Sequence, residues 1–258
     1  MGTQKISQSL ADATAAAAAA VVEPLHPYHP LGVAIPGYLA NEMATIEILA
    51  YFVVGCTLIL GSTMYLVRRF GVARPGAKGT SGGGISNLEV ATAMWFVLCG
   101  FIHIGMEGYV VYHSATIASS RTLLGQAWKE YSLSDSRYLT QDTFVIPMEA
   151  VTAVFWGPLS FVIAYMITVD HPLRHPLQAA VSMGQLYGDV LYYATCAYEH
   201  FVKARVFCRP EGAYFWGYFI FLNAFWIVIP LLLLVSSARA TAQAVRKVRE
   251  LEGAKKLR

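Results

Sequence analysis

Five long apolar segments limit what this 258-residue chain can fold into. They cover residues 48–67, 90–112, 144–169, 176–198 and 213–238. Each has at least 20 residues and at most one Asp, Glu, Lys or Arg, so each can cross about 30 Å of hydrocarbon as a helix. An open sheet would leave backbone groups unsatisfied in lipid. The sequence therefore predicts an all-α, polytopic membrane protein built on a five-transmembrane-helix bundle.

Composition agrees with this class and excludes others. Charged residues make up 14% of the chain, against roughly a quarter in soluble domains. The net charge is only +3, so no nucleic-acid partner is expected, and no Walker, dinucleotide or zinc-binding pattern is present. We interpret the four cysteines as small core residues, with a Cys196–Cys208 disulfide as the minor alternative.

The chain divides into three parts. Residues 1–44 form an N-terminal tail, mostly flexible, with an alanine run at Ala15–Ala20 and a Pro/His-rich extended segment at Leu25–Pro36. Residues 45–238 are the transmembrane domain, and residues 239–258 are a basic, solvated tail. Within the domain, a flexible linker contains Gly82–Gly84, and residues 113–142 form the longest loop.

The distribution of Lys and Arg predicts the orientation. The side of the membrane that would hold the C-terminus carries twelve of the 19 basic residues, and the other side carries seven. Because basic residues concentrate in cytosolic loops, we expect a luminal N-terminus and a cytosolic C-terminus. The last four residues, Lys255–Arg258, resemble a dilysine retrieval signal of the endoplasmic reticulum, although they also fit an ordinary basic tail.

Two polar side chains interrupt the second apolar segment. His103 and Glu107 are four residues apart, which places both on one face of a helix, one turn apart. An imidazole and a carboxylate are costly in hydrocarbon, so such residues usually face a bundle interior or a cavity. This face is therefore a candidate active site within an intramembrane ligand cavity.

Polar groups on the other segments fall at a similar depth. Counted from the same membrane edge at about 1.5 Å per residue, the set lies roughly 8–15 Å deep on four helices. The set comprises His103, Glu107, Glu149, Asp189 and Asn223. Thr152 follows Glu149 by about one helical turn, and Trp226 follows Asn223 by the same spacing. Taken alone, Asp189 is best explained by a structural hydrogen bond between helices, to Gln185 or to a tyrosine hydroxyl. Asn223 is best explained by a packing contact between helices. The convergence of His103, Glu107 and Glu149 favours a functional site.

Such a site suits proton chemistry on an apolar substrate. Carboxyl groups and an imidazole can add and remove protons, and the face of Trp226 can support a cation. No metal-ligand set or phosphate-binding loop accompanies them. The residues therefore indicate a reaction through a cationic transition state.

Ten short stretches, taken together and in order, resemble the emopamil-binding protein family of sterol Δ8-Δ7 isomerases. They are LHPY (25–28), CGFIH (99–103), EGY (107–109), WKEY (128–131), DSRY (135–138), ME (148–149), WGPLS (156–160), HPLR (171–174), GQLYGDVLYY (184–193) and YFWGYFIFLNAFWIVIP (214–230). The resemblance spans residues 25–235. The alanine-rich N-terminus, the Gly-rich linker and the 199–212 loop depart from the family pattern.

The resemblance implies an enzyme of sterol biosynthesis in the endoplasmic reticulum membrane. It would move a double bond by protonation at C9 and deprotonation at C7 through a carbocation, without a cofactor. The family's essential residues fall on His103, Glu107 and Glu149 as proton-transfer groups, with Thr152 and Asn223 orienting the carboxylates. Trp226 would face the cation, and Met148 and Tyr138 are further candidates for substrate binding. Cationic amphiphilic drugs are expected ligands, because a protonated amine mimics the carbocation, and the family also suggests a homodimer.

The loop motifs and the function each leave alternatives open. Trp128, Tyr131, Asp135, Arg137 and Tyr138 would either cover the cavity mouth or brace it, and we favour bracing. The chain could also be a non-catalytic sterol or amphiphile receptor, as related sigma-2-receptor-like and emopamil-binding-protein-like proteins are. A structural or trafficking protein with polar groups as helix contacts is a further alternative. Turnover would separate the first of these from an enzyme.

Overall fold

The computed structural model describes residues 26–72 and 84–256, and in these ranges the protein is all-helical, with no strand. The first, fourth and fifth long helices are α2 (Thr45–Phe70), α8 (Arg174–Lys203) and α9 (Asn223–Lys256) with η5 (Ala213–Leu222) before it. The second is built from α3 (Asn87–Phe101), η1 (Ile102–Glu107) and α4 (Gly108–Tyr112). Between it and α8 lies a helix made of α6 (Val145–Val151), η4 (Thr152–Trp156) and α7 (Gly157–Thr168).

Four of these helices are long and apolar enough to cross a membrane: residues 45–70, 87–112, 145–168 and 213–256. They match four of the five predicted segments. The remaining predicted segment, 176–198, lies within the 30-residue helix α8. This helix is less apolar than the other four and is not among those four. Its sequence carries Gln178, Gln185 and Asp189.

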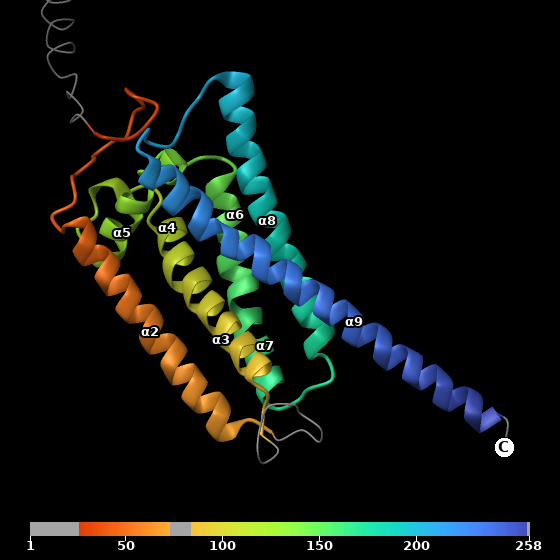
Figure 1. Cartoon of the computed structure of the whole chain (residues 1–258). Helices are drawn as coiled ribbons and strands as arrows, with labels where there is room; N and C mark the ends of the chain where they lie inside the picture. The colour runs from red at the N-terminus through yellow and green to blue at the C-terminus, as the bar shows by residue number, and fades with distance from the viewer. Residues whose placement is uncertain (1–25, 73–83, 257–258) are drawn as a thin grey trace, which may run out of the picture.

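The long helices run alternately up and down in one bundle (Figure 1). α2 lies at one edge beside α3, and most of its apolar side chains are exposed. α9 crosses the bundle along α8, and its C-terminal half projects away from the other helices. The basic segment that starts at residue 239 continues α9 as far as Lys256.

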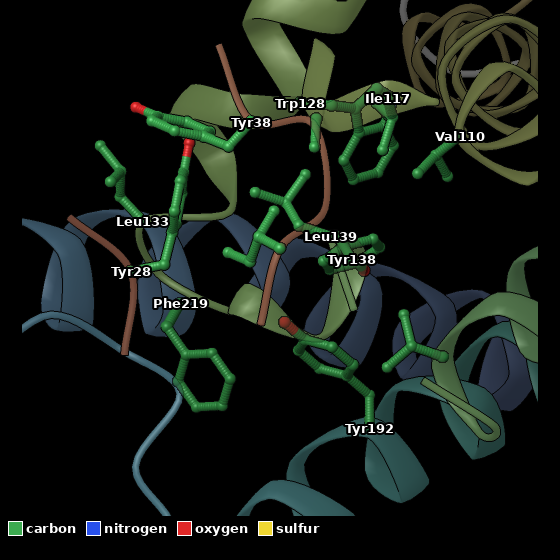
Figure 2. Packing of buried hydrophobic residues seen from close by; sticks show 13 residues of the cluster. Tyr28, Tyr38, Val110, Ile117, Trp128, Leu133, Tyr138, Leu139, Tyr192 and Phe219 are labelled. Carbon is green, nitrogen blue, oxygen red and sulfur yellow. The ribbon is translucent and has the colours of Figure 1, made fainter. Parts of the chain in front are cut away.

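One end of the bundle is closed by packed short elements. The predicted loop 113–142 contains η2 (Ile117–Ser119), α5 (Leu123–Tyr131) and η3 (Ser136–Tyr138). Its side chains join those of the 26–44 segment in a buried aromatic cluster (Figure 2). Buried polar contacts tie the two segments: Tyr28 Oη donates to the Lys129 carbonyl (3.0 Å), and Lys129 Nζ donates to the Leu39 carbonyl (2.7 Å). The described part of the N-terminal segment is therefore an ordered part of the core.

The other half of the bundle has its own apolar core between α3, α7, α8 and α9. Phe96, Cys99, Ile163 and Val181 are fully buried there. Near this end, Arg174 Nη1 at the start of α8 lies 2.8 Å from Glu89 Oε1 at the start of α3. This pair fixes the two helices to each other next to the connections.

Several expectations concern residues outside the described ranges: the alanine run, most of the Gly-rich linker, and the last two residues of the dilysine-like sequence. All four cysteines are free in the structure, and only Cys99 is fully buried. The core role expected for the others is therefore met only in part.

Candidate active site

Three of the long helices contain π-helical turns, and two of these, η1 and η4, contact each other. The segments η1, η4 and η5 interrupt the helices that carry His103, Thr152 and Asn223. A π turn adds a residue to the backbone ring and often marks a functional site. Within η1 the pair still meets as predicted, with His103 Nδ1 2.7 Å from Glu107 Oε2.

Thr152 connects this pair to the next helix. Its hydroxyl lies 2.5 Å from Glu107 Oε2 and 3.3 Å from Glu149 Oε2. The four groups therefore form a continuous hydrogen-bonded chain: His103, Glu107, Thr152 and Glu149. His103 and Glu149 are 2% and 5% exposed, so both ends of the chain are buried.

The two ends of the chain are held by further side chains. Tyr138 Oη, from η3, donates to Glu149 Oε1 at 2.7 Å. Gln185 Nε2, from α8, lies 3.0 Å from His103 Nε2. When the amide donates there, the imidazole carries its proton on Nδ1 and donates it to Glu107.

A cavity of about 370 Å³ opens next to this chain. Aromatic and aliphatic side chains make most of its wall, and four carboxyl groups line it. These are Glu107, Glu130, Glu149 and Asp189. The cavity therefore has few polar groups in a mostly apolar wall, as in sites that orient an apolar ligand.

Trp226 and Asn223 both line this cavity but differ in role. The ring of Trp226 lies 6.4 Å from that of His103 and 5.4 Å from that of Trp95, so an aromatic surface faces the imidazole. The amide of Asn223 donates to Tyr131 Oη (2.9 Å) and to the Phe219 carbonyl (2.7 Å), and the described residues show no hydrogen bond from it to a carboxyl group. The wide turns of η5 leave that carbonyl within its reach.

Asp189 also lines the cavity, and the structural tie that we favoured for it is not formed. Gln185 contacts His103 instead, and Tyr193 Oη donates to the carbonyls of Phe219 and Ile220. The buried Oδ2 of Asp189 has no hydrogen-bond partner in the described part of the chain. Met148 lines the cavity as well, and its Sδ lies 3.9 Å from the position of a Cβ on Gly188, the residue before Asp189.

The loop motifs both line and brace the cavity. Trp128, Tyr131 and Tyr138 contribute to its wall. Behind them, Arg137 forms a buried ion pair with Asp135 (2.7 Å) and donates to Thr195 on α8 (2.9 Å). Burial alone would lower the pKa of the Arg137 guanidinium, but the charge and hydrogen bonds of Asp135 raise it above its ordinary value.

Comparison with known proteins agrees with these motifs. The model of the EXPERA (EXPanded EBP superfamily) family matches residues 123–237. The chain is 37% identical over 226 residues to the 3β-hydroxysteroid-Δ8,Δ7-isomerase of Mus musculus, covering 86% of this chain and 92% of that protein. The chain belongs to the EXPERA (EXPanded EBP superfamily) family.

Two plant relatives extend the comparison. A probable 3β-hydroxysteroid-Δ8,Δ7-isomerase of Arabidopsis thaliana is 32% identical over 209 residues, 81% of this chain and 85% of that protein. Protoglabretal synthase of Citrus sinensis is 33% identical over 151 residues, 57% of this chain and 68% of that protein. The EXPERA match contains Glu149 and Thr152, whereas His103 and Glu107 precede it.

Sequence reasoning missed two members of the site. Gln185 entered only as a partner for Asp189, although its spacing of four residues from Asp189 already placed both on one face of α8. Trp95 lies two turns before His103 on the same helix and lines the cavity. Its position on the polar face was the available signal.

Proposed function

We propose that this protein is a 3β-hydroxysteroid Δ8-Δ7 isomerase that moves the double bond of a Δ8-sterol by proton transfer. The observation that carries this proposal is the chain of hydrogen bonds from His103 through Glu107 and Thr152 to Glu149. The names of the family's mouse and plant members support the same reaction.

The reaction balances without another reactant. One acid of the chain gives a proton to C9, the π electrons of the C8–C9 bond form the new C–H bond, and C8 becomes cationic. The other end of the chain removes a proton from C7, and that electron pair forms the C7–C8 bond. Glu149 holds one of these roles and the His103–Glu107 pair holds the other.

Thr152 resets the site between turnovers. Its hydroxyl can donate to Glu107 while it accepts from a protonated Glu149, so a proton taken up at one end can return to the other. The distances between these oxygens permit this exchange without movement of a helix. The acid and the base are then restored without net consumption of protons.

The cavity wall supports the cationic intermediate. The carboxyl groups provide negative charge, and Trp226 and Trp95 provide aromatic faces. The same combination would hold a protonated amine in an apolar scaffold, so we propose cationic amphiphilic drugs as ligands of this cavity. Met148 and Tyr138 would contact the substrate beside Glu149.

We propose that α8 is the fifth membrane-spanning helix and that the cavity lies within the bilayer. α8 is long enough to span and places its polar residues toward the cavity or toward α9. The basic-residue distribution supports a luminal N-terminus and a cytosolic C-terminus in the endoplasmic reticulum membrane. The chain would then consist of an N-terminal segment to residue 44, an isomerase domain to residue 238 and a basic tail, acting as a homodimer.

Turnover by purified protein in lipid nanodiscs tests the proposal. We expect wild type to convert a Δ8-sterol to its Δ7 isomer, and Glu149→Gln to lose about 100-fold or more in kcat, since general acid–base groups contribute at least this much. Binding of a protonated amphiphilic amine controls for folding of the variant. A wild type that binds the amine but yields no Δ7 product would show a receptor in place of an enzyme.

A further inference from the structure

The cavity contains one carboxyl group that the proton-transfer chain does not use and the protein does not satisfy. Glu107 is held by His103 and Thr152, and Glu149 by Tyr138. Glu130 accepts from Thr45 (3.1 Å) and from Tyr218 (3.1 Å). Asp189 lines the same cavity, and its buried Oδ2 has no partner among the described residues. A buried acceptor without a partner is costly, so the group is expected to meet a ligand or a bound water.

The position of Asp189 relative to the chain is fixed by its helix. Gln185 and Asp189 are four residues apart on α8, so they share a face and differ by about 6 Å along the axis. The Gln185 amide lies 3.0 Å from His103 Nε2, so Asp189 lies one helical turn along α8 from the residue that contacts the imidazole. It is therefore near the reacting atoms but outside the proton-transfer chain.

The proposed substrate has one group that needs such an acceptor. A 3β-hydroxysterol is a rigid apolar skeleton with a single hydroxyl at C3, on the ring next to the one that holds C7, C8 and C9. Four other cavity-lining residues have an unsatisfied polar atom among the described residues: Trp95, Gln185, Tyr192 and Trp226. The two indole N–H groups only donate, so they cannot accept from a hydroxyl. The Gln185 amide contacts His103 Nε2, and Tyr192 is 2% exposed within the aromatic cluster. Asp189 is the unsatisfied carboxyl group of the cavity.

We infer that Asp189 accepts a hydrogen bond from the substrate's 3β-hydroxyl and makes the enzyme selective for 3β-hydroxysterols. This inference rests on the proposed isomerase function. The hydroxyl fixes the sterol's position along the cavity, so that C9 and C7 lie at the two ends of the proton-transfer chain. A site built to satisfy a hydroxyl discriminates against an analogue that lacks it, because its own acceptor is then left unpaired.

The test compares a Δ8-sterol with its 3-deoxy counterpart on the full-length protein in nanodiscs. Binding is measured directly for both sterols, and KM and kcat are measured in parallel. We expect wild type to prefer the hydroxysterol by about 10- to 100-fold, the range of a hydrogen bond to a charged group. Asp189→Ala should remove this preference by weakening hydroxysterol binding, with kcat changed much less than KM.

Two variants keep the result interpretable. Asp189→Asn retains an acceptor oxygen, so we expect a preference between those of wild type and Asp189→Ala. Tyr187→Phe removes a hydroxyl from the exposed face of α8 and should behave as wild type. Thermal unfolding of each variant shows whether it is folded.

Each outcome decides something. An unchanged preference in folded Asp189→Ala would overturn the role of Asp189, as would equal binding of the two sterols by wild type. Sterol binding that depends on Asp189 without any turnover would retain the hydroxyl site and reject the proposed isomerase. Equal loss for both sterols in Asp189→Ala would mean a structural role and would also contradict the inference.

Discussion

Thr152 places one hydroxyl between two carboxyl groups, and this single atom joins the halves of the site. Replacing it by valine keeps the shape and removes the hydrogen bonds. We expect Thr152→Val to lower kcat by about 10- to 100-fold, because Glu107 and Glu149 can no longer exchange a proton and a buried acceptor is left unpaired. Steady-state turnover of a Δ8-sterol is the measurement.

Thr152→Ser is the matched control, since it keeps the hydroxyl and loses only a methyl group. Its kcat should remain within about threefold of wild type, with a small loss of stability from the lost methyl. Equal loss in the serine and valine variants would show that packing at residue 152 matters and that the hydroxyl does not.

At this scale, the sequence predicted which residues meet but not all of their partners. The spacing of His103 and Glu107 and the depth of Glu149 are local properties of apolar helices, so the pattern alone contained them. The partner of Asn223 depends on the wide turns of η5, and the approach of Gln185 to His103 depends on how α8 rotates in the bundle. Neither is encoded in a single helix.

Close helix contacts at the π turns hold the site in place. A Cβ on Gly157 would lie 2.6 Å from Ile104 and 3.3 Å from the Cβ of His103. We expect Gly157→Ala to lower the free energy of unfolding by about 1–3 kcal/mol, as overpacking does. It should also lower turnover, because the clash moves the helix that carries the imidazole.

Gly61→Ala on α2 is the comparison, because no atom outside its own stretch of helix lies within 4 Å of the added Cβ. The higher helix propensity of alanine should leave stability unchanged or raise it by up to about 1 kcal/mol. Thermal unfolding and turnover of both variants are the readouts. A Gly157→Ala protein with wild-type stability and activity would show that this contact does not position His103.

A buried ion pair at the start of η3 supports the tyrosine that holds Glu149. Asp135 is fully buried, and Arg137 is 2% exposed in its side chain. Replacing Asp135 by Asn leaves the guanidinium buried without a counter-charge, which costs about 3–5 kcal/mol. We expect a large fall in thermal stability together with loss of activity through Tyr138.

Glu211→Gln breaks a second pair with the same spacing, Arg209 with Glu211, that lies on the surface. Exposed pairs contribute little, so this variant should unfold close to wild type. Similar destabilisation by the two changes would contradict the assignment of a structural role to the buried pair.

For the elements, the apolar segments predicted the long helices to within about five residues, except at the C-terminal end of α9, which continues to Lys256. The sequence did not predict π turns, because they arise where tertiary contacts outweigh regular helical bonding. Residues 113–142 were expected as a loop, yet they fold into short helices around buried aromatic residues. From the WKEY and DSRY motifs we predicted only that this segment either covers or braces the mouth of the cavity.

For the whole molecule, the alternating helices place the 204–212 connection and the end of α9 on opposite sides of the bundle (Figure 1). The proposed orientation makes the first luminal and the second cytosolic. We expect an N-glycosylation acceptor inserted at residues 204–212 to be glycosylated in microsomes, and one inserted after residue 250 to remain unmodified. The reverse pattern would show that the orientation is inverted while the site is unchanged.

The most direct measurement of the central claim is a single turnover of a Δ8-sterol by enzyme equilibrated in deuterated water. If the chain of His103, Glu107, Thr152 and Glu149 delivers the proton, the Δ7 product carries one deuterium at C9, and folded Glu149→Gln forms far less of it. A Δ7 product with hydrogen alone at C9 would contradict proton delivery from this site.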